Sequence, residues 1–472
     1  MANSIDNVLA EFESHWSEHL EDLKNLVRIP SVSFDGFDPA EVKRSAAFVA
    51  ELMKKRGLEN VEVIGLGDAH PYVYGEWLKA PGKPTVLLYA HHDVQPPGRA
   101  DVWKTKPFEP TLKDGPGGKR LYARGIADDK AGVIVHTAAI GSYLKVLGKL
   151  PLNVKVVIEG EEEVGSTHLF EFLQKNRQKL QADVLILTDT TNFDVGIPAL
   201  TIALRGLVGV GVELRALNGT VHSGMWGGPI PDPVMALSKI LAGMTDSEGN
   251  ITIPGIREMI MPLSKEEESE FKALPFNEAR FREQVGLRPT AKLLRQGPSP
   301  LAQVWRYPSL TVTAIQASSR AQPGNIINDV AWAKVTIRVA PGMDEKKVNA
   351  ALVDYIRKQV PWGLELVLEE EVCSGPWYTD PRAPRNEKAF QIAEQALEKG
   401  YGKPVVKMGC GGSIPFVQPF AEALGGAPAL LIGVEDPFTN AHGENESLLV
   451  EDLRKACVSQ IHLFQDLAEH YK

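Results

Sequence analysis

Three short stretches of the chain are apolar almost without interruption, and they limit most strongly what it can fold into. They are "TVLLYA" (85–90), "NVKVVI" (153–158) and "DVLILT" (183–188). A strand that is apolar at nearly every position is buried on both faces of its sheet. Helical spacing of apolar residues occurs near or between these strands, at 40–56, 129–147 and 166–180. Strands alternating with helices predict an α/β sheet covered on both faces.

The pattern changes after about residue 204. The predicted elements then follow the order strand, helix, strand, strand, helix, strand, from "GLVGVGVELRAL" to "LELVLEEE". This βαββαβ order is that of the ferredoxin-like split unit. A charged segment interrupts it, and Ser264 with Glu267 three places on forms the pattern of a capping box, which predicts a helix there. After a linker rich in Pro and charge at 380–390, the α/β pattern resumes with a helix at 386–399 and a strand at 428–434.

With 472 residues the chain is long enough for two domains. We predict a large domain in two parts, 1–204 and 384–472, with a smaller domain, 205–383, inserted between them. The large domain should open with one amphipathic helix from Ser4 or Asp6 to Val27, stopped by Pro30.

Polar residues follow the predicted strands at five places, where open α/β sheets bind their ligands. The segments are "HHD" (91–93), "ADDK" (127–130), "EEE" (161–163), "TDT" (188–190) and "NAHGE" (440–444). In an extended chain His91 and Asp93 point to the same face, so that the carboxylate can orient the imidazole.

Each segment also has an ordinary structural interpretation. The histidines are consistent with a core position, Asp128 and Asp129 with helix capping, and the glutamates with a solvated loop. Five such sites without cysteine instead favour two divalent ions bridged by a carboxylate. In that case one of two adjacent glutamates binds a metal and its neighbour is free to accept a proton.

The composition excludes several other classes. The net charge of −9 with no basic patch argues against nucleic acid or an anionic membrane as partner. Cys373, Cys410 and Cys457 lie far apart, so neither a disulfide framework nor a thiolate zinc site is expected. The acidic N-terminal segment does not resemble a signal peptide, and no apolar run is long enough for a membrane span. We therefore expect a cytoplasmic protein.

These motifs, in this order, resemble the dinuclear zinc peptidases of the aminoacylase, carboxypeptidase and carnosinase superfamily, and most of all its cytosolic nonspecific dipeptidases and carnosinases. The resemblance runs from "LVRIPSVS" to "NAHGENES". It implies a catalytic α/β domain with a mixed sheet and an inserted ferredoxin-like lid that also forms a homodimer. It further implies two divalent ions, zinc or manganese.

The resemblance assigns a role to each motif. The implied metal ligands are His91, Asp128, Glu163, Asp189 and His442. Asp128 would bridge the ions, and its peptide bond to Asp129 would be cis. Asp93 would orient His91, and Glu162 would be the general base that deprotonates a bridging water for attack on the scissile amide.

The lid would supply substrate contacts. His222, in "NGTVHSGMWGGP", would reach the neighbouring subunit's site and stabilise the oxyanion. Asn325 would contact substrate across the dimer, and Arg338 and Ser413 would bind the substrate's carboxylate. Closure about hinges near residues 204 and 384 would precede chemistry, and peptides longer than two or three residues would fit badly.

The sequence departs from the family pattern at two places. Ala131 replaces the usual glycine after Asp-Asp-Lys, which should only tighten the helix start. Gly409 and Cys410 stand where many dipeptidases have Arg-Glu, so recognition of the substrate's amino end is expected to differ.

Three other functions were weighed. A nucleotide-binding enzyme is disfavoured because Ile414 and Pro415 break the glycine fingerprint after Gly411. An N-acyl- or N-carbamoyl-amino-acid amidohydrolase would use the same metals and base and remains the alternative to a dipeptidase. A noncatalytic binding subunit is disfavoured because every ligand and Glu162 are retained.

Overall fold

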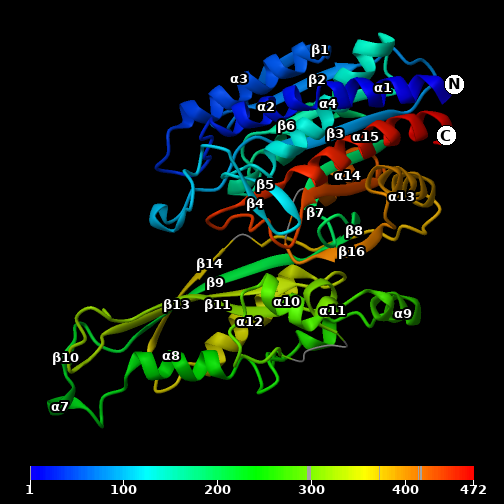
Figure 1. Ribbon diagram of the computed structural model, residues 1–472. Coiled ribbons are helices and arrows are strands. Elements are labelled where there is room, and N and C mark those ends of the chain that lie inside the picture. The colour runs from blue at the N-terminus through cyan, green and yellow to red at the C-terminus, as the bar shows by residue number, and fades with distance from the viewer. Residues whose placement is uncertain (1, 295–298, 372, 413, 415–416, 472) are drawn as a thin grey trace. The chain divides into compact units, whose positions relative to one another are not determined.

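The computed structural model describes residues 2–294, 299–371, 373–412, 414 and 417–471. The chain forms two compact units (Figure 1). The first comprises Met1–Ile202, Asp380–Met408 and Phe416–Lys472, and the second comprises Ala203–Thr379 and Gly409–Pro415. The divisions expected from the sequence were after residues 204 and 383. That residues 409–415 belong to the second unit was not anticipated.

The largest sheet has nine strands among the described residues and is mixed. Its order is β1 (Glu59–Ile64), β2 (Tyr72–Trp77), β6 (Asn153–Glu159), β3 (Thr85–His91), β7 (Val184–Thr191), β17 (Ala429–Glu435), β8 (Ala199–Leu204) and β15 (Trp377–Tyr378), with β16 (Val406–Cys410) also paired to β8. The four central strands, β6, β3, β7 and β17, are parallel. They are the four strands predicted from apolar runs, and the pairs β1–β2, β2–β6, β17–β8 and β15–β8 are antiparallel.

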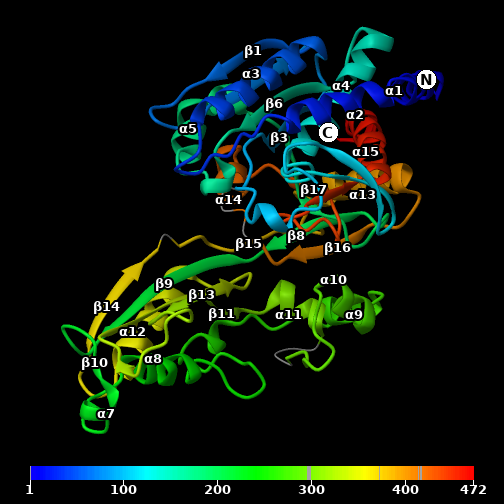
Figure 2. The same cartoon turned by 60° about the vertical axis from the view of Figure 1, so that its left-hand side comes forward.

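Helices cover both faces of this sheet (Figure 2). One face packs against α1 (Ala2–Ser14), α2 (Trp16–Val27), α3 (Pro39–Lys55), α4 (Lys130–Leu147), α13 (Glu387–Tyr401) and α15 (Val450–His470). The other face carries α5 (Leu169–Lys175) and α14 (Val417–Ala423). Strand β3 shows the alternation, because Leu88 lies in the core on the α4 side whereas Tyr89 contacts the ring of Phe420 in α14. The predicted α/β architecture is confirmed.

Two predicted helices are broken. The single helix expected up to Val27 is α1 and α2, separated at His15, where the Ser14 hydroxyl donates to the Glu11 carbonyl 2.8 Å away. The helix expected over 166–180 is α5 followed by α6 (Arg177–Leu180), and Asn176 between them donates its side-chain amide to the Phe172 carbonyl.

A small antiparallel sheet of β18 (Ser447–Leu449), β5 (Gly118–Tyr122) and β4 (Thr111–Gly115) was not predicted. It joins the segment before α4 to the segment after β17, although more than 300 residues separate them in the chain. Its pairing places the loops that carry Asp128 and His442 beside each other.

The second unit is a four-stranded antiparallel sheet in the order β11 (Ser309–Gln316), β13 (Val330–Val339), β9 (Gly206–Arg215) and β14 (Glu365–Glu370). Helices α8 (Pro233–Ala242) and α12 (Glu345–Gln359) pack against one face and form its core. Along β13 every second residue from Ala331 to Val339 is buried, as expected for a sheet covered on one face. The βαββαβ order predicted from the sequence is present.

Short elements complete this unit. The charged segment forms α9 (Lys265–Ala273), with the predicted capping box between Ser264 and Glu267, and is followed by α10 (Glu278–Gln284) and α11 (Pro300–Arg306). A two-residue ladder of β10 (Val221–His222) and β12 (Ile326–Ile327) leads into α7 (Ser223–Trp226). Arg257–Met259 forms a 3₁₀ turn in this unit, and Ala100–Val102 and Glu162–Val164 form 3₁₀ turns in the first unit.

Candidate metal centre

The carboxyl ends of the four parallel strands place the predicted site residues at one edge of the sheet. His91 is the last residue of β3, and Asp189 lies near the carboxyl end of β7. Glu162 and Glu163 follow β6, and His442 follows β17. Because parallel strands end at the same edge, residues that are hundreds of positions apart in the chain meet there.

Asp128 lies between the two histidines. One of its carboxylate oxygens is 3.0 Å from Nε2 of His91, and the other is 3.0 Å from Nε2 of His442. A carboxylate that turns each oxygen to a different imidazole has the arrangement of a bridging metal ligand. The peptide bond from Asp128 to Asp129 is cis, as expected.

The remaining predicted ligands complete two groups. Glu163 Oε2 lies 3.3 Å from Nε2 of His442, and Asp189 Oδ1 lies 3.8 Å from Nε2 of His91. Within each group the donor atoms lie within 4.8 Å of one another, and no cysteine takes part. The first group contains His91 and Asp189, and the second contains Asp128, Glu163 and His442.

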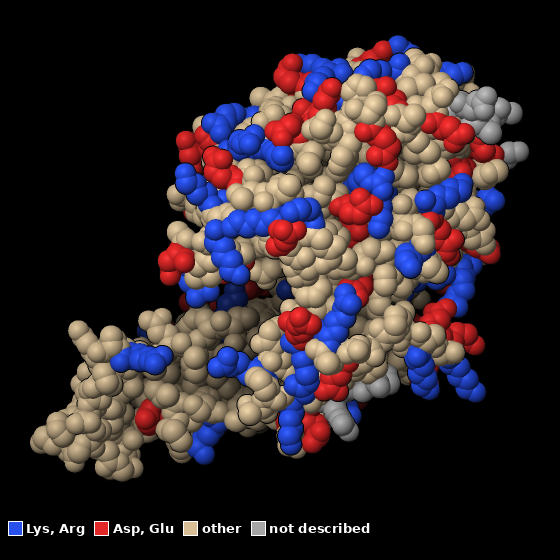
Figure 3. Space-filling view, viewed as in Figure 1, with Lys and Arg blue, Asp and Glu red and all other residues tan. Residues whose placement is uncertain are grey.

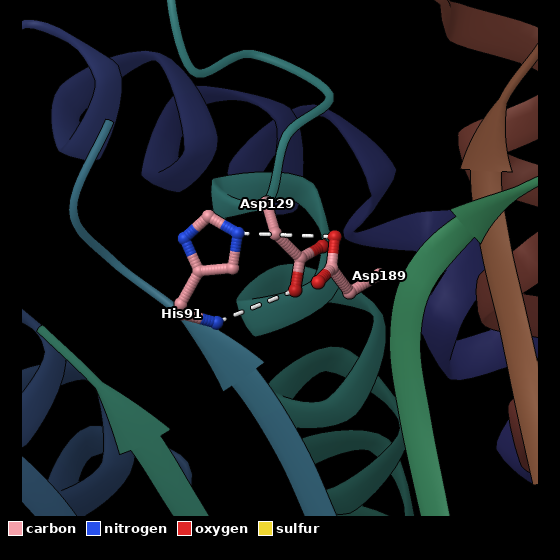
Figure 4. Close-up of side chains that lie close together, drawn as sticks. All are labelled: His91, Asp129 and Asp189. Atoms are coloured by element: carbon pink, nitrogen blue, oxygen red, sulfur yellow. Dashed lines mark hydrogen bonds and ion pairs between the residues drawn. The ribbon is translucent and has the colours of Figure 1, made fainter. Parts of the chain in front are cut away.

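Asp129 belongs to the first group as well, although the sequence gave no metal role to it. Figure 4 shows the Asp129 carboxylate beside the carboxylate of Asp189 and the imidazole of His91, and it accepts the backbone N–H of His91 at 3.3 Å. The interpretation of Asp129 as a helix cap is wrong, because its side chain makes no capping hydrogen bond to α4. Of the two aspartates, Asp128 is the one whose oxygen faces the imidazole nitrogen of His91.

Asp93 holds both the histidine and the glutamate turn. Its Oδ1 lies 3.4 Å from Nδ1 of His91, on the far side of the ring from Asp128. Its two oxygens accept the backbone N–H groups of Glu162 at 3.2 Å and Glu163 at 3.1 Å, and the Ser33 hydroxyl at 2.7 Å. One fully buried carboxylate therefore orients the imidazole and the segment that carries the predicted base.

The other structural interpretations fail for the glutamates but apply to His92. The side chains of Glu162 and Glu163 are only 13% and 2% exposed, which excludes a solvated loop. His92 points to the opposite side of its strand and bonds through Nε2 to the Pro71 carbonyl at 3.1 Å. It is the core histidine of the pair.

Ionisation in the site reflects crowding of buried carboxyls. Burial, reinforced by the charge of Asp189, raises the pKa of Glu162 well above its usual range. Burial and the charge of Asp128 do the same to the pKa of Glu163. Burial alone would raise the pKa of Asp128, but hydrogen bonds from His442 and His91 lower it below its usual value. A raised pKa suits a group that accepts and returns a proton.

The residues present fit a pair of divalent cations. No lysine or arginine of the described residues forms an ion pair with the carboxyls of Asp128, Glu163 or Asp189, and their ionic partners are the two histidines. Several buried carboxyls facing two imidazoles are stable as anions only beside positive charge. The nitrogen and oxygen donors are those preferred by zinc and manganese.

Two further residues, which the sequence did not single out, contribute to the site. Gln95 donates its backbone N–H and its side-chain amide to the two oxygens of Glu163, at 3.1 and 2.7 Å. The carboxyl of Glu435 is buried near Asp128 and Asp189, and burial followed by these charges raises its pKa. Glu435 is the final residue of β17, so its place at a strand end was the available signal.

The predicted lid residues lie in the second unit. His222 and Asn325 are both exposed and are held together by the β10–β12 ladder and by the bond from the Ser223 N–H to the Asn325 carbonyl. Arg338 is partly buried on β13, and burial lowers its pKa. Ser413 lies outside the described residues.

The departure at Gly409 has a local cause. A Cβ atom at this position would lie 2.6 Å from the Cβ atom of Trp305 in α11. Any side chain there would displace the indole, so the glycine and the tryptophan fit each other.

Comparisons with known proteins agree with this architecture. The model of the family described as Peptidase family M20/M25/M40 matches residues 87–466. Cysteinylglycine-S-conjugate dipeptidase of Corynebacterium striatum is 32% identical over 380 residues, 80% of this chain and 80% of the relative. Human Beta-Ala-His dipeptidase is 28% identical over 472 residues, 94% of this chain and 89% of the relative. The solved structure of the dipeptidase Dug1p from Saccharomyces cerevisiae has a TM-score of 0.86 at 26% identity and covers 100% of both chains.

The fold and the site define a metallopeptidase. The chain belongs to the M20/M25/M40 peptidase family. This confirms the superfamily predicted from the sequence motifs and the hydrolase class that it implied. Among the helices that the structure describes, none has the length and apolar character needed to cross a membrane.

Proposed function

We propose that this protein is a metal-dependent dipeptidase that cleaves the amide bond of peptides of two or three residues with a free C-terminal carboxylate. The observation that carries the proposal is the shared position of Asp128, with one oxygen at each of two imidazoles. The printed activities of the relatives, which are dipeptidases, support the same substrate class.

The ligand set would hold two divalent ions, and we propose zinc or manganese. His91, Asp128 and Asp189 would hold one ion, and Asp128, Glu163 and His442 the other. When bound, the ions supply Lewis acidity toward water and the amide carbonyl.

Glu162 is proposed as the group that moves the proton. Its Oε2 lies 4.0 Å from Nε2 of His91, and its backbone N–H donates to the Asp93 carboxylate at 3.2 Å. Its carboxylate would take a proton from the attacking water and return it to the leaving amine, a role that its position beside His91, with a side chain only 13% exposed, supports. Asp93 would keep the His91 imidazole and the Glu162 carboxylate in fixed positions relative to each other.

The second unit is proposed to act as lid and dimerisation domain, with hinges near 204 and 384. Arg338 and Ser413 would bind the substrate's carboxylate, so that longer peptides fit badly. His222 and Asn325 would act on the neighbouring subunit, where His222 would donate to the oxyanion.

A charge-poor surface supports the dimer. Residues 216–231, which include His222 and α7, contain no Asp, Glu, Lys or Arg. Within this surface Met225 is 76% and Trp226 is 53% exposed. Figure 3 shows few charged side chains over the β10 and α7 end of the unit. Large exposed apolar side chains without nearby charge are typical of a protein interface.

The activity is tested with a panel of dipeptides, tripeptides and N-acetyl amino acids. The enzyme is stripped with a chelator and then reloaded with zinc, manganese or cobalt. We expect dipeptide hydrolysis that is lost on stripping, restored by metal, and reduced about 10²–10⁴-fold in kcat by Glu162→Gln. The matched control is Glu161→Gln in the same turn. Rapid cleavage of N-acetyl amino acids with inert dipeptides would favour the amidohydrolase instead.

The dimer is tested by sedimentation. Trp226→Asp should give monomers with low kcat, since His222 would be lost from the opposite site. Trp362, with a similar exposure of 57%, is the control, and Trp362→Asp should leave the dimer intact. A monomeric but fully active enzyme would contradict the role of His222. The cytoplasmic location remains a prediction and is tested by cell fractionation.

A further inference from the structure

Two buried ion pairs connect the segment before α4 to the segment after β17. Arg124 donates through one terminal nitrogen to Glu446 at 2.8 Å, and the side chains are 1% and 0% exposed. Arg120 likewise donates to Asp436 at 2.8 Å, with both side chains fully buried. Arg120 lies on β5 of the small sheet, whereas Arg124, Asp436 and Glu446 lie in the loops next to it, and the two pairs differ in what else they contact.

The Glu446 carboxylate accepts hydrogen bonds from the backbone of the loop that leads to Asp128. Its Oε2 accepts the N–H of Gly125 at 2.9 Å, and its Oε1 accepts the N–H groups of Ala127 at 3.1 Å and Asp128 at 3.3 Å. These residues belong to neither a helix nor a strand, so no regular ladder holds them. Glu446 supplies the acceptors that such a buried loop needs.

Arg124 extends the same network to the second loop. Its other terminal nitrogen donates to the backbone carbonyl of His442 at 3.0 Å. His442 has a φ of +62°, a backbone conformation that residues other than glycine rarely adopt. Surrounding contacts must therefore stabilise it. One ion pair therefore contacts the main chain at both Asp128 and His442.

We propose that the Arg124–Glu446 pair is a positioning element that sets the spacing of Asp128 and His442. It thereby sets the affinity with which these two residues and Glu163 bind a divalent ion. The inference rests on the proposed metal-dependent function. Neither residue lies among the candidate ligands, and both act through the backbone of residues that do. Groups that orient metal ligands in this way change metal affinity about 10–100-fold when they are altered.

The second ion pair is a matched control. Arg120 and Asp436 have the same burial and the same nitrogen to oxygen distance. Their other hydrogen bonds go to Ser447, the Pro116 carbonyl and the Phe438 N–H, none of which is a candidate ligand. Breaking this pair removes a similar buried charge interaction without removing a hydrogen bond to the backbone of His442 or of residues 125–128.

The test compares Glu446→Gln with Asp436→Asn in the full chain. Zinc and manganese binding is measured by competition with a chromophoric chelator, and thermal unfolding is measured in the metal-free state. We expect both variants to lose thermal stability, but only Glu446→Gln to lose metal affinity, by about 10–100-fold and most for the ion held by Glu163 and His442. Wild-type affinity in Glu446→Gln, or an equal loss in Asp436→Asn, would overturn the inference.

Arg124→Lys gives an independent measurement if Glu446→Gln does not fold. A lysine keeps the positive charge but has a single nitrogen, so it cannot bond to Glu446 and to the His442 carbonyl with two separate arms. The same selective loss of one ion is expected, and unchanged binding would refute the proposal. If the unaltered protein binds no metal, the proposed function fails, which is a separate result.

Discussion

Replacement of Asp93 by asparagine tests whether one carboxylate holds the base-bearing turn. In the structure this carboxylate accepts three donors, the Ser33 hydroxyl and the N–H groups of Glu162 and Glu163. Asparagine has one oxygen instead of two. The Ser33 hydroxyl can rotate and accept a bond from the new amide, but a backbone N–H cannot reverse its role. At least one N–H of the turn is therefore left facing an NH₂ group.

The magnitude follows from these contacts. A buried donor without an acceptor costs about 1–3 kcal/mol. The remaining N–H bond also loses its charged acceptor and becomes roughly half as strong. We therefore expect the metal-free protein to lose about 2–4 kcal/mol of unfolding free energy in Asp93→Asn. Because Glu162 moves with the turn and His91 keeps only the Asp93 backbone carbonyl, 3.1 Å from its Nδ1, kcat should fall about 10–100-fold.

The assay pairs urea unfolding of the metal-free protein with steady-state dipeptide hydrolysis of the metal-loaded enzyme. Ser33→Ala is the control, because it removes one donor to the same carboxylate and leaves both backbone bonds in place. It should cost about 0.5–1.5 kcal/mol and leave kcat close to that of the unaltered enzyme. If Asp93→Asn matched Ser33→Ala in both measurements, the proposed hold on the turn would be wrong.

Two further predictions concern the core. Burial raises the pKa of Glu159 to about 8, so the folded state keeps a proton that the unfolded chain releases near pH 4.5. The free energy of unfolding should therefore fall as the pH rises between these values, by at most about 1.4 kcal/mol per pH unit. Glu159→Gln cannot titrate, so its metal-free unfolding curves should show a shallower pH dependence over this range, and an unaltered slope would exclude Glu159 as its source. Gly433→Ala should destabilise by about 3 kcal/mol or more in thermal unfolding, because the new Cβ would lie 1.4 Å from the Thr190 carbonyl oxygen. Gly65→Ala, whose Cβ would have no atom within 4 Å, should leave the stability unchanged.

The sequence predicted the parts of the fold whose burial is simplest. The four central strands are buried on both faces and therefore have nearly continuous apolar runs, and the second unit shows alternating burial along β13. Strand β5, "GKRLY", has no such pattern, because the buried Arg120 within it is neutralised by Asp436 from a distant segment. A pairing of this kind is visible only after folding.

The site shows the same division. Five segments of acidic residues or histidine at strand ends and a helix start predicted a metal centre, but the choice of Asp128 and Glu163 within them came only from the resemblance to the peptidase superfamily. Gln95 and Glu435 join the site through contacts across the sheet and have no distinctive spacing. Asp129 was given no metal role because the resemblance assigns that role to its neighbour Asp128, whereas the Asp129 carboxylate turns toward the His91 backbone.

The central place of β17 affects how the protein is made. This strand pairs with β7 on one side and β8 on the other, yet it ends at residue 435, whereas β7 ends at residue 191. A ribosome adding about 5–20 residues per second needs roughly 10–50 seconds to cover that interval. Throughout it, the apolar edge of β7 has no neighbour on this side, and such an edge invites aggregation. His442 emerges later still, so a nascent chain lacks one proposed metal ligand until residue 442 has been made.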